Sequence, residues 1–287
     1  MQEIQWFPGH MTKAMRMMEE NIRLTDGVLM VLDARAPAAT FNKKLKKLCG
    51  NKPVLYILNK ADLSDRSRTD AFVAEISADA QVMLCSANAK GAAQRISGKI
   101  AVLLKAKTEK DAAKGMTRVP RLMVAGIPNT GKSTIINALS GEKRAATGNR
   151  AGVTRGKQWI RCAGFELLDT PGTMPPAFEN QILARHLAYI GSIRDEILNR
   201  EEIALCLLGE IGREYPQYLA ERYGAEEGMS AEEIFSSVCR RRGFLLRGGE
   251  PDRERAAAAV LDDFRKGRIG AVTLEKAADY AGFFRGE

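Results

Sequence analysis

The chain has 287 residues, of which 45% are hydrophobic and 28% charged, as in a folded protein with one large core or two modest ones. It contains no run of 18 apolar residues and begins without the pattern of a secretory signal, so we expect neither a membrane span nor secretion. Five scattered cysteines and two histidines argue against disulfides, a zinc site or a histidine-rich metal site, and favour reduced thiols in a cytoplasm.

The net charge of +9 is unevenly distributed, because the excess of lysine and arginine lies before residue 200 and residues 200–287 are slightly acidic. A basic body favours an anionic polymer or a ligand with several phosphates as partner. A solvated surface would give the same count, so charge alone leaves both interpretations open.

Three short apolar runs stand near the start of the chain, at 27–34 (GVLMVLDA), 53–59 (PVLYILN) and 80–87 (AQVMLCSA). Such runs are typical of strands buried on both faces, and the segments between them have helical spacing. The sequence then predicts a helix over 91–107 and a polar linker over about 108–118 (TEKDAAKGMTR).

A fourth strand is expected at 120–126, followed by a helix from Lys132 to about Leu139 and by two strands separated by Gly164. Alternating strands and helices predict an α/β fold with a mostly parallel sheet and helices on both faces. From about residue 178 the pattern is helical throughout, and Ser230 with Glu233 forms a capping box. We therefore expect an α/β domain over 1–178 and an all-helical domain over 179–287.

The segment GIPNTGKST (126–134) matches the phosphate-binding loop pattern G-x-x-x-x-G-K-[ST], with a strand before it and a helix after it. Its backbone N–H groups and the helix N-terminus are expected to hold the phosphates of a nucleotide. Lys132 should reach the β- and γ-phosphates, and Ser133 should ligate Mg²⁺. The other nucleotide contacts expected from this loop are Asn129, Thr130, Gly131 and Thr134.

Two further segments complete the predicted phosphate and Mg²⁺ site. DTPG (169–172) follows a strand, so Asp169 is placed to hold Mg²⁺ through water and the Gly172 N–H to meet the γ-phosphate. Thr154 lies in the loop between the two phosphate motifs, and its hydroxyl is expected to close on Mg²⁺.

NKAD (59–62) follows a buried strand and indicates which base is bound. The Asp62 carboxylate can accept hydrogen bonds from N1–H and the exocyclic amine of guanine, a donor pair that adenine lacks. Asn59 is expected to bridge to the phosphate loop, and the stem of Lys60 to lie on the ring face. SAN, which comprises Ser86, Ala87 and Asn88, follows the next strand and offers a backbone N–H to guanine O6.

The order of these motifs is unusual, because the guanine-reading segments precede the phosphate loop. This order predicts a P-loop GTPase fold with a circularly permuted motif order, in which the linker at about 108–118 joins the former ends. Permutation is physically tolerable since every motif lies on a loop at the same edge of the sheet.

Together with WFPGHM (6–11) and DARAP (33–37), these motifs resemble the YlqF-related ribosome biogenesis GTPase A family over essentially the whole chain. The resemblance implies GTP hydrolysis, with GTP as substrate, GDP as product and Mg²⁺ as cofactor. It also implies a late step of large ribosomal subunit maturation, stimulation by the ribosomal particle, and a helical domain that contacts rRNA. We expect a cytoplasmic monomer without membrane attachment.

The hydrolytic machinery departs from common patterns. Many GTPases orient the attacking water with a Gln after D-x-x-G, but Thr173 stands there, where the family has an aliphatic residue. The resemblance gives the water-orienting role to His10, which would act catalytically with Lys132; a structural or RNA-facing His10 is the alternative. Asn129 matches the Asn of potassium-stimulated GTPases and would ligate K⁺, unless it is an ordinary loop residue. His186, in an apolar helical pattern, is expected to pack.

Three basic runs are either RNA contacts or solvated faces. They are Lys43, Lys44, Lys46 and Lys47; Lys105, Lys107, Lys110 and Lys114; and Arg240, Arg241 and Arg242. Two other functions stay open. One is a permuted GTPase of small-subunit assembly, although such relatives carry a nucleic-acid barrel or a zinc-binding tail that this chain lacks. The other is a non-hydrolysing GTP-binding scaffold, which the missing Gln suggests.

Overall fold

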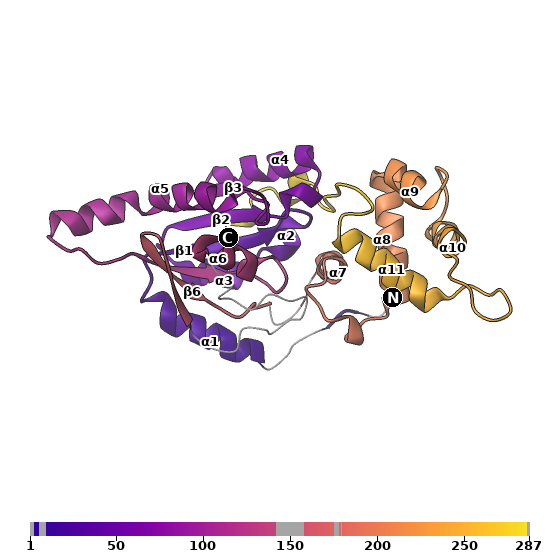
Figure 1. Ribbon diagram of the computed structural model, residues 1–287, viewed down its shortest axis with the longest axis horizontal. Coiled ribbons are helices and arrows are strands. Elements are labelled where there is room, and N and C mark those ends of the chain that lie inside the picture. Colours follow the sequence, from indigo (N-terminus) through magenta and orange to yellow (C-terminus); the bar gives the residue numbers. More distant parts are fainter. Residues whose placement is uncertain (1–2, 6–9, 142–157, 175–177, 179, 286–287) are drawn as a thin grey trace.

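The computed structural model describes residues 3–5, 10–141, 158–174, 178 and 180–285, and it places an α/β part beside a helical part (Figure 1). The α/β part contains one six-stranded sheet with the order β3-β2-β1-β4-β6-β5. All neighbouring strands run parallel except β5, which is antiparallel to β6. The strands are β1 (Gly27–Asp33), β2 (Val54–Asn59), β3 (Gln81–Leu84), β4 (Arg121–Ala125), β5 (Gln158–Cys162) and β6 (Phe165–Asp169).

The apolar runs of the sequence form strands because both faces of the sheet are covered by helices. Along β1, Leu29 and Val31 pack into one core, whereas Met30 and Leu32 pack into another. This alternation follows from the two-residue period of a strand. One face carries α5 (Ala92–Ala113) and α6 (Lys132–Ser140), and the other carries α1 (His10–Ile22), α3 (Lys43–Cys49) and α4 (Arg66–Ser77).

The connection between the two halves of the sheet is shorter than the sequence suggested. α5 continues to Ala113, so the first half of the expected 108–118 linker is helical and projects beyond the sheet (Figure 1). Lys107 and Asp111 form an i,i+4 ion pair at 2.5 Å, and Arg118 reaches the same carboxylate at 3.2 Å. Such pairs support a helix in a polar segment, which is why composition alone misplaced its end.

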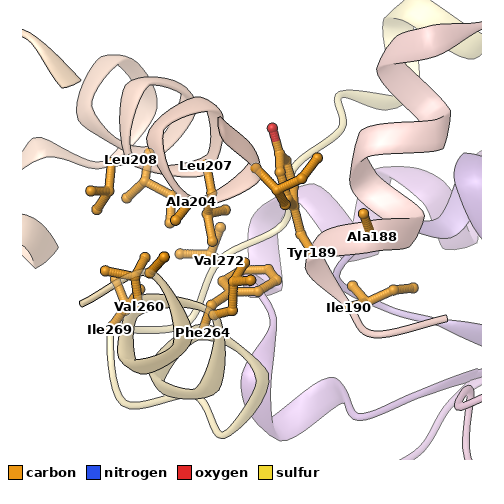
Figure 2. Packing of buried hydrophobic residues seen from close by; sticks show 14 of the residues in the cluster. Ala188, Tyr189, Ile190, Ala204, Leu207, Leu208, Val260, Phe264, Ile269 and Val272 are labelled. Atoms are coloured by element: carbon orange, nitrogen blue, oxygen red, sulfur yellow. The ribbon is translucent and has the colours of Figure 1, made fainter. Parts of the chain in front are cut away.

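The helical part contains α7 (Gln181–Tyr189), α8 (Arg200–Glu214), α9 (Pro216–Tyr223), α10 (Ala231–Arg242) and α11 (Arg253–Arg265). The predicted capping box opens α10, since Ser230 and Glu233 each accept from the other's backbone N–H. Figure 2 shows the shared core, in which Leu207 of α8 and Phe264 of α11 face each other near Tyr189 of α7.

The last residues of the chain leave the helical part and return to the sheet. After α11, residues 272–285 run along the α/β part, where the short 3-10 turns Ala277–Tyr280 and Phe283–Arg285 lie. The Phe284 ring packs against Phe41 at 5.0 Å and Phe72 at 5.9 Å between centroids. The end of the expected 179–287 domain therefore covers the α/β part. In the part of the chain described, no helix combines the length and apolarity that a membrane crossing needs.

Candidate nucleotide site

The phosphate loop follows β4 and ends where α6 begins, at Lys132. Gly131 precedes the helix with φ 98°, and a Cβ on it would lie 2.1 Å from Nδ2 of Asn59. Only glycine allows this close approach in a left-handed conformation. The chain therefore turns tightly into α6, whose first N–H groups have no partner within the helix and suit an anion.

Lys132 is buried at this loop, with 8% of its surface exposed, and its Nζ donates to the Ile127 carbonyl at 2.8 Å. Burial lowers the pKa of this amine to about 8, although the charge of Asp169 opposes the shift. A buried ammonium is costly unless an anion pairs with it. The loop thus combines a buried cation, whose charge is only partly balanced by its neighbours, with a helix N-terminus. Both features fit the phosphates of a nucleotide.

DTPG lies directly against this loop. Asp169 ends β6 and is buried, and Thr170 Oγ1 donates to the Val124 carbonyl at 2.6 Å. A Cβ on Gly172 would lie 2.7 Å from the backbone nitrogen of Pro128, so a glycine is needed for the two segments to meet. Ser133, in the first turn of α6, and Asp169 provide hydroxyl and carboxylate oxygens, the ligand atoms that Mg²⁺ prefers.

Asn59 links all three nucleotide-reading segments. Its Nδ2 donates to the Thr130 carbonyl at 2.9 Å, and its Oδ1 accepts from the Ala87 N–H at 3.0 Å. The bridge expected from the sequence is therefore present, and it reaches SAN as well. Because the carboxyl ends of parallel strands meet at one edge of a sheet, β2, β3 and β4 bring NKAD, SAN and the phosphate loop together.

Asp62 lies on the short 3-10 turn Ala61–Leu63, and its side chain is exposed. The Asp62 N–H donates to Ser86 Oγ at 3.0 Å, which joins NKAD to SAN a second time. Asn88 is exposed at the same edge. An exposed carboxylate beside backbone donors is a suitable acceptor for the guanine N1–H and amine.

Lys60 reaches from NKAD to the phosphate loop. Its Nζ donates to Asp33 Oδ2 at 2.8 Å and to the Asn129 carbonyl at 2.7 Å. Lys60 and Asn129 are also the described non-glycine residues with positive φ, at 60° and 62°. Left-handed backbone at such residues is strained and is held in place by its surroundings, as functional sites often require.

Asp33 and Arg35 belong to DARAP, and reasoning from residue chemistry alone did not assign them a role. Both are buried at the end of β1, where the guanidinium makes two bonds to the carboxylate at 2.8 and 2.9 Å. Burial would raise the pKa of Asp33, but the charges of Arg35 and Lys60 outweigh it and hold that pKa well below its ordinary value. The available signal in the sequence was an Asp at the end of an otherwise apolar strand, with an Arg two residues later.

Contacts from the helical part reach the phosphate loop, and the sequence did not predict them. Asn129 Nδ2 donates to the Gly191 carbonyl at 2.5 Å, and Ser192 Oγ donates to the Pro128 carbonyl at 2.7 Å. Arg35 also donates to the last carbonyls of α11, at Phe264 and Arg265. The nucleotide loops and the helical part therefore form one connected structure.

Some predicted residues are placed differently or lie outside the described residues. Thr154 is outside them. His10 begins α1, but its side chain is outside them too. His186 does not pack among apolar groups alone, because its ring nitrogens contact Glu275 at 3.0 Å and Glu210 at 3.1 Å. Burial lowers the pKa of His186, but the two carboxylates outweigh it and raise the pKa to about 9.

The basic runs are only partly free for a partner. Arg242 pairs with Asp263 at 2.6 Å, and Lys43 stacks 4.9 Å from the centre of the Phe283 ring. Lys44 and Lys47 on α3 and Arg240 at the end of α10 are exposed.

Known proteins resemble this chain over most of its length. The profile of the family described as 50S ribosome-binding GTPase matches residues 121–212. The protein named ribosome biogenesis GTPase A from Bacillus cereus is 38% identical over 281 residues, which covers 96% of this chain and 95% of that protein. Its namesake from Bacillus licheniformis is 39% identical, with 96% and 99% covered.

Solved structures agree with this relationship. A GDP-bound YlqF structure has a TM-score of 0.63 and 29% identity, covering 92% of this chain and all of that one. The GNP-bound YlqF from T. maritima has a TM-score of 0.61 and 29% identity, covering 92% and 98%. With the relatives above, these matches extend over both the α/β part and the helical part, and the chain therefore belongs to the ribosome biogenesis GTPase A family, a family of GTPases.

Proposed function

We propose that this protein binds GTP at the edge of its sheet and hydrolyses it during a late step of large ribosomal subunit assembly. The observation that carries the proposal is the Asn59 side chain, which bonds Thr130 of the phosphate loop and Ala87 of SAN at once. One nucleotide spanning this bridge would have its base beside Asp62 and its phosphates beside Lys132. The family and the names of the relatives support the ribosomal role.

Each side chain has a chemical task in this proposal. Asp62 accepts the two guanine donors and so selects GTP over ATP. Asn129, Thr130, Gly131, Ser133, Thr134 and Gly172 supply donors to the phosphates, and Lys132 neutralises charge that grows on them during bond cleavage. Ser133, Thr154 and Asp169 hold Mg²⁺, which when bound offsets the phosphate charge.

The attacking water needs a residue to orient it, and Thr173 is buried where many GTPases have Gln. We assign this role to His10, whose helix starts at that residue. A neutral imidazole nitrogen can accept a proton from water at physiological pH. We propose that the ribosomal particle stimulates hydrolysis through this residue.

Asn129 is the proposed ligand for K⁺ beside the β–γ bridge, where a cation would stabilise the leaving group. Its strained backbone and its contact with Gly191 hold it in the loop. GTP turnover should be faster in KCl than in NaCl at equal ionic strength, and equal rates would remove K⁺ from the proposal.

The remaining parts of the proposal concern partners. We propose the exposed lysines of α3 and Arg240 as rRNA contacts, and binding through phosphates would weaken as salt rises. We propose a cytoplasmic monomer with no membrane attachment.

The test is GTP turnover of wild type and His10→Ala, alone and with purified large or small subunits. We expect the large subunit to accelerate the wild type and to have little effect on His10→Ala. Acceleration by small subunits instead would indicate a different particle. No turnover in any mixture would indicate a GTP-binding scaffold.

A further inference from the structure

Residues 272–275, here called the strap, run beside the loop that carries Asp62. The Val272 N–H donates to the Leu63 carbonyl at 3.2 Å, next to Asp62 in the chain. The Leu274 N–H donates to the Arg35 carbonyl at 2.8 Å. The strap therefore bonds both the NKAD loop and the loop after β1, although about 200 residues separate it from them.

Thr273 lies at the centre of these contacts and is completely buried. Its hydroxyl donates to the Ala34 carbonyl at 3.2 Å and accepts from the Asp65 N–H at 3.1 Å. Its carbonyl accepts from Arg68 Nη1 at 2.9 Å and from the Tyr215 hydroxyl at 3.0 Å. One threonine thus joins the end of β1, the start of α4 and the helical part.

The strap is fixed on its other side by the helical part. The Val272 side chain is buried near Leu207 and Phe264 (Figure 2). Glu275 accepts from the N–H groups of Ala38 and Ala39 at the start of α2 (Pro37–Thr40) at 2.6 and 3.0 Å. Glu275 also contacts His186 Nδ1 of α7 at 3.0 Å, so Val272 and Glu275 anchor the two ends of the strap in the helical part.

We propose that Thr273 is a positioning residue for guanine recognition, through which the helical part holds the Asp62 loop in register with the base. The proposal rests on the proposed GTP site. Asp62 is exposed on a single 3-10 turn with little packing of its own, so its neighbours decide where the carboxylate points. A pair of parallel hydrogen bonds to guanine tolerates little displacement, and its supporting contacts must be rigid.

The test compares the binding of GDP and inosine diphosphate (IDP) to the full-length chain. IDP keeps N1–H but lacks the exocyclic amine, so the ratio of the two affinities reports the bond from that amine to Asp62. Thr273→Val keeps the shape of the side chain and removes its hydroxyl, whereas Thr273→Ser keeps the hydroxyl. We expect Thr273→Val to lose about tenfold in GDP affinity, on the order of one buried hydrogen bond, and to lower the GDP:IDP ratio. Thr273→Ser should retain most of the wild-type GDP affinity and most of the wild-type GDP:IDP ratio.

Ser237→Ala is the matched control, because it also removes a buried hydroxyl bond, to the Tyr223 carbonyl at 2.9 Å, but within the helical part. It should leave the GDP:IDP ratio unchanged. Tyr215→Phe is a milder change at the strap, and it should lower the ratio less than Thr273→Val does. If Thr273→Val does not fold, the GDP:IDP ratio of Tyr215→Phe tests the proposal in its place.

An unchanged ratio in folded Thr273→Val, or in Tyr215→Phe where the first variant is unfolded, would overturn the inference. That outcome is distinct from failure of the GTP site itself, in which the wild type would not prefer GDP over ADP.

Discussion

At the scale of single residues, Lys132 shows how the fold prepares for a ligand that it does not itself supply. Its ammonium is buried and bonds only a carbonyl among the contacts described, so burial lowers its pKa to about 8. A phosphate would supply the missing negative charge and favour the protonated form.

This predicts that nucleotide affinity depends on pH. Below about pH 8 the amine is already charged, but above it binding must take up a proton, so GDP affinity should fall as pH rises. The expected loss is about fivefold from pH 8 to pH 9, measured by calorimetry in matched buffers. Lys132→Gln, which does not titrate there, should bind more weakly with a flatter profile. A flat profile in the wild type would contradict the assignment.

Thr173 differs from Lys132, because its buried hydroxyl makes no hydrogen bond to the residues that the structure describes. Among the described residues no hydrogen-bond partner lies near its hydroxyl, and the residue is fully buried. Thr173→Val should therefore stabilise the nucleotide-free protein by about 1 kcal/mol in urea unfolding, since an unsatisfied hydroxyl is removed. A lower stability of the variant would mean that the hydroxyl has a partner after all.

At the scale of elements, short charged clusters join helices to the sheet edge. Glu275 of the C-terminal segment bonds the first N–H groups of α2 and His186 of α7, and His186 contacts Glu210 of α8. Tyr189 adds a hydroxyl bond to Glu210 at 2.9 Å. These side chains form a buried ion network, and the stability that the network contributes depends on the charge of His186.

The network predicts a pH-dependent stability. The pKa of His186 is raised to about 9 in the folded protein from an ordinary 6.5, so its stabilisation is complete below about pH 6.5 and is lost as pH rises through 9. The loss should be on the order of 2 to 3 kcal/mol. It should appear as the difference between wild type and His186→Gln in urea unfolding from pH 6 to 9.5. A pH-independent difference would show that His186 is not charged in the native state.

At the scale of the whole molecule, structure that is set within short segments could be predicted from the sequence, whereas most contacts between residues far apart in the chain could not. The strands and the phosphate loop follow from short motifs whose geometry is set by neighbouring residues, and the Asn59 bridge follows because these motifs share one edge of the sheet. The contact of Arg35 with Phe264 and that of Glu275 with His186 join residues far apart in the chain, and no periodicity marks such pairs. The return of Phe284 to Phe41 and Phe72 was missed for the same reason.

The contacts between the two parts make the nucleotide loops dependent on the helical part. Gly191 and Ser192 touch the phosphate loop, Arg35 reaches the end of α11, and the strap lies beside the NKAD loop. The boundary at residue 178 marks a change of secondary structure, but the nucleotide site draws support from both sides of it.

If segments from both halves of the α/β part converge on one guanine nucleotide, Asp62→Asn should change which base is bound. We would measure the affinities of wild type, Asp62→Asn and Lys132→Gln for GDP, xanthosine diphosphate and ADP. We expect Asp62→Asn to weaken GDP binding by about 10²-fold or more and to favour xanthosine diphosphate, whose 2-oxo group can accept a hydrogen bond from the new amide. Lys132→Gln should weaken the binding of all three nucleotides by a similar factor, because it removes a phosphate contact that they share. Equal binding of ADP and GDP by the wild type, or an Asp62→Asn protein with unchanged GDP affinity, would contradict this convergence.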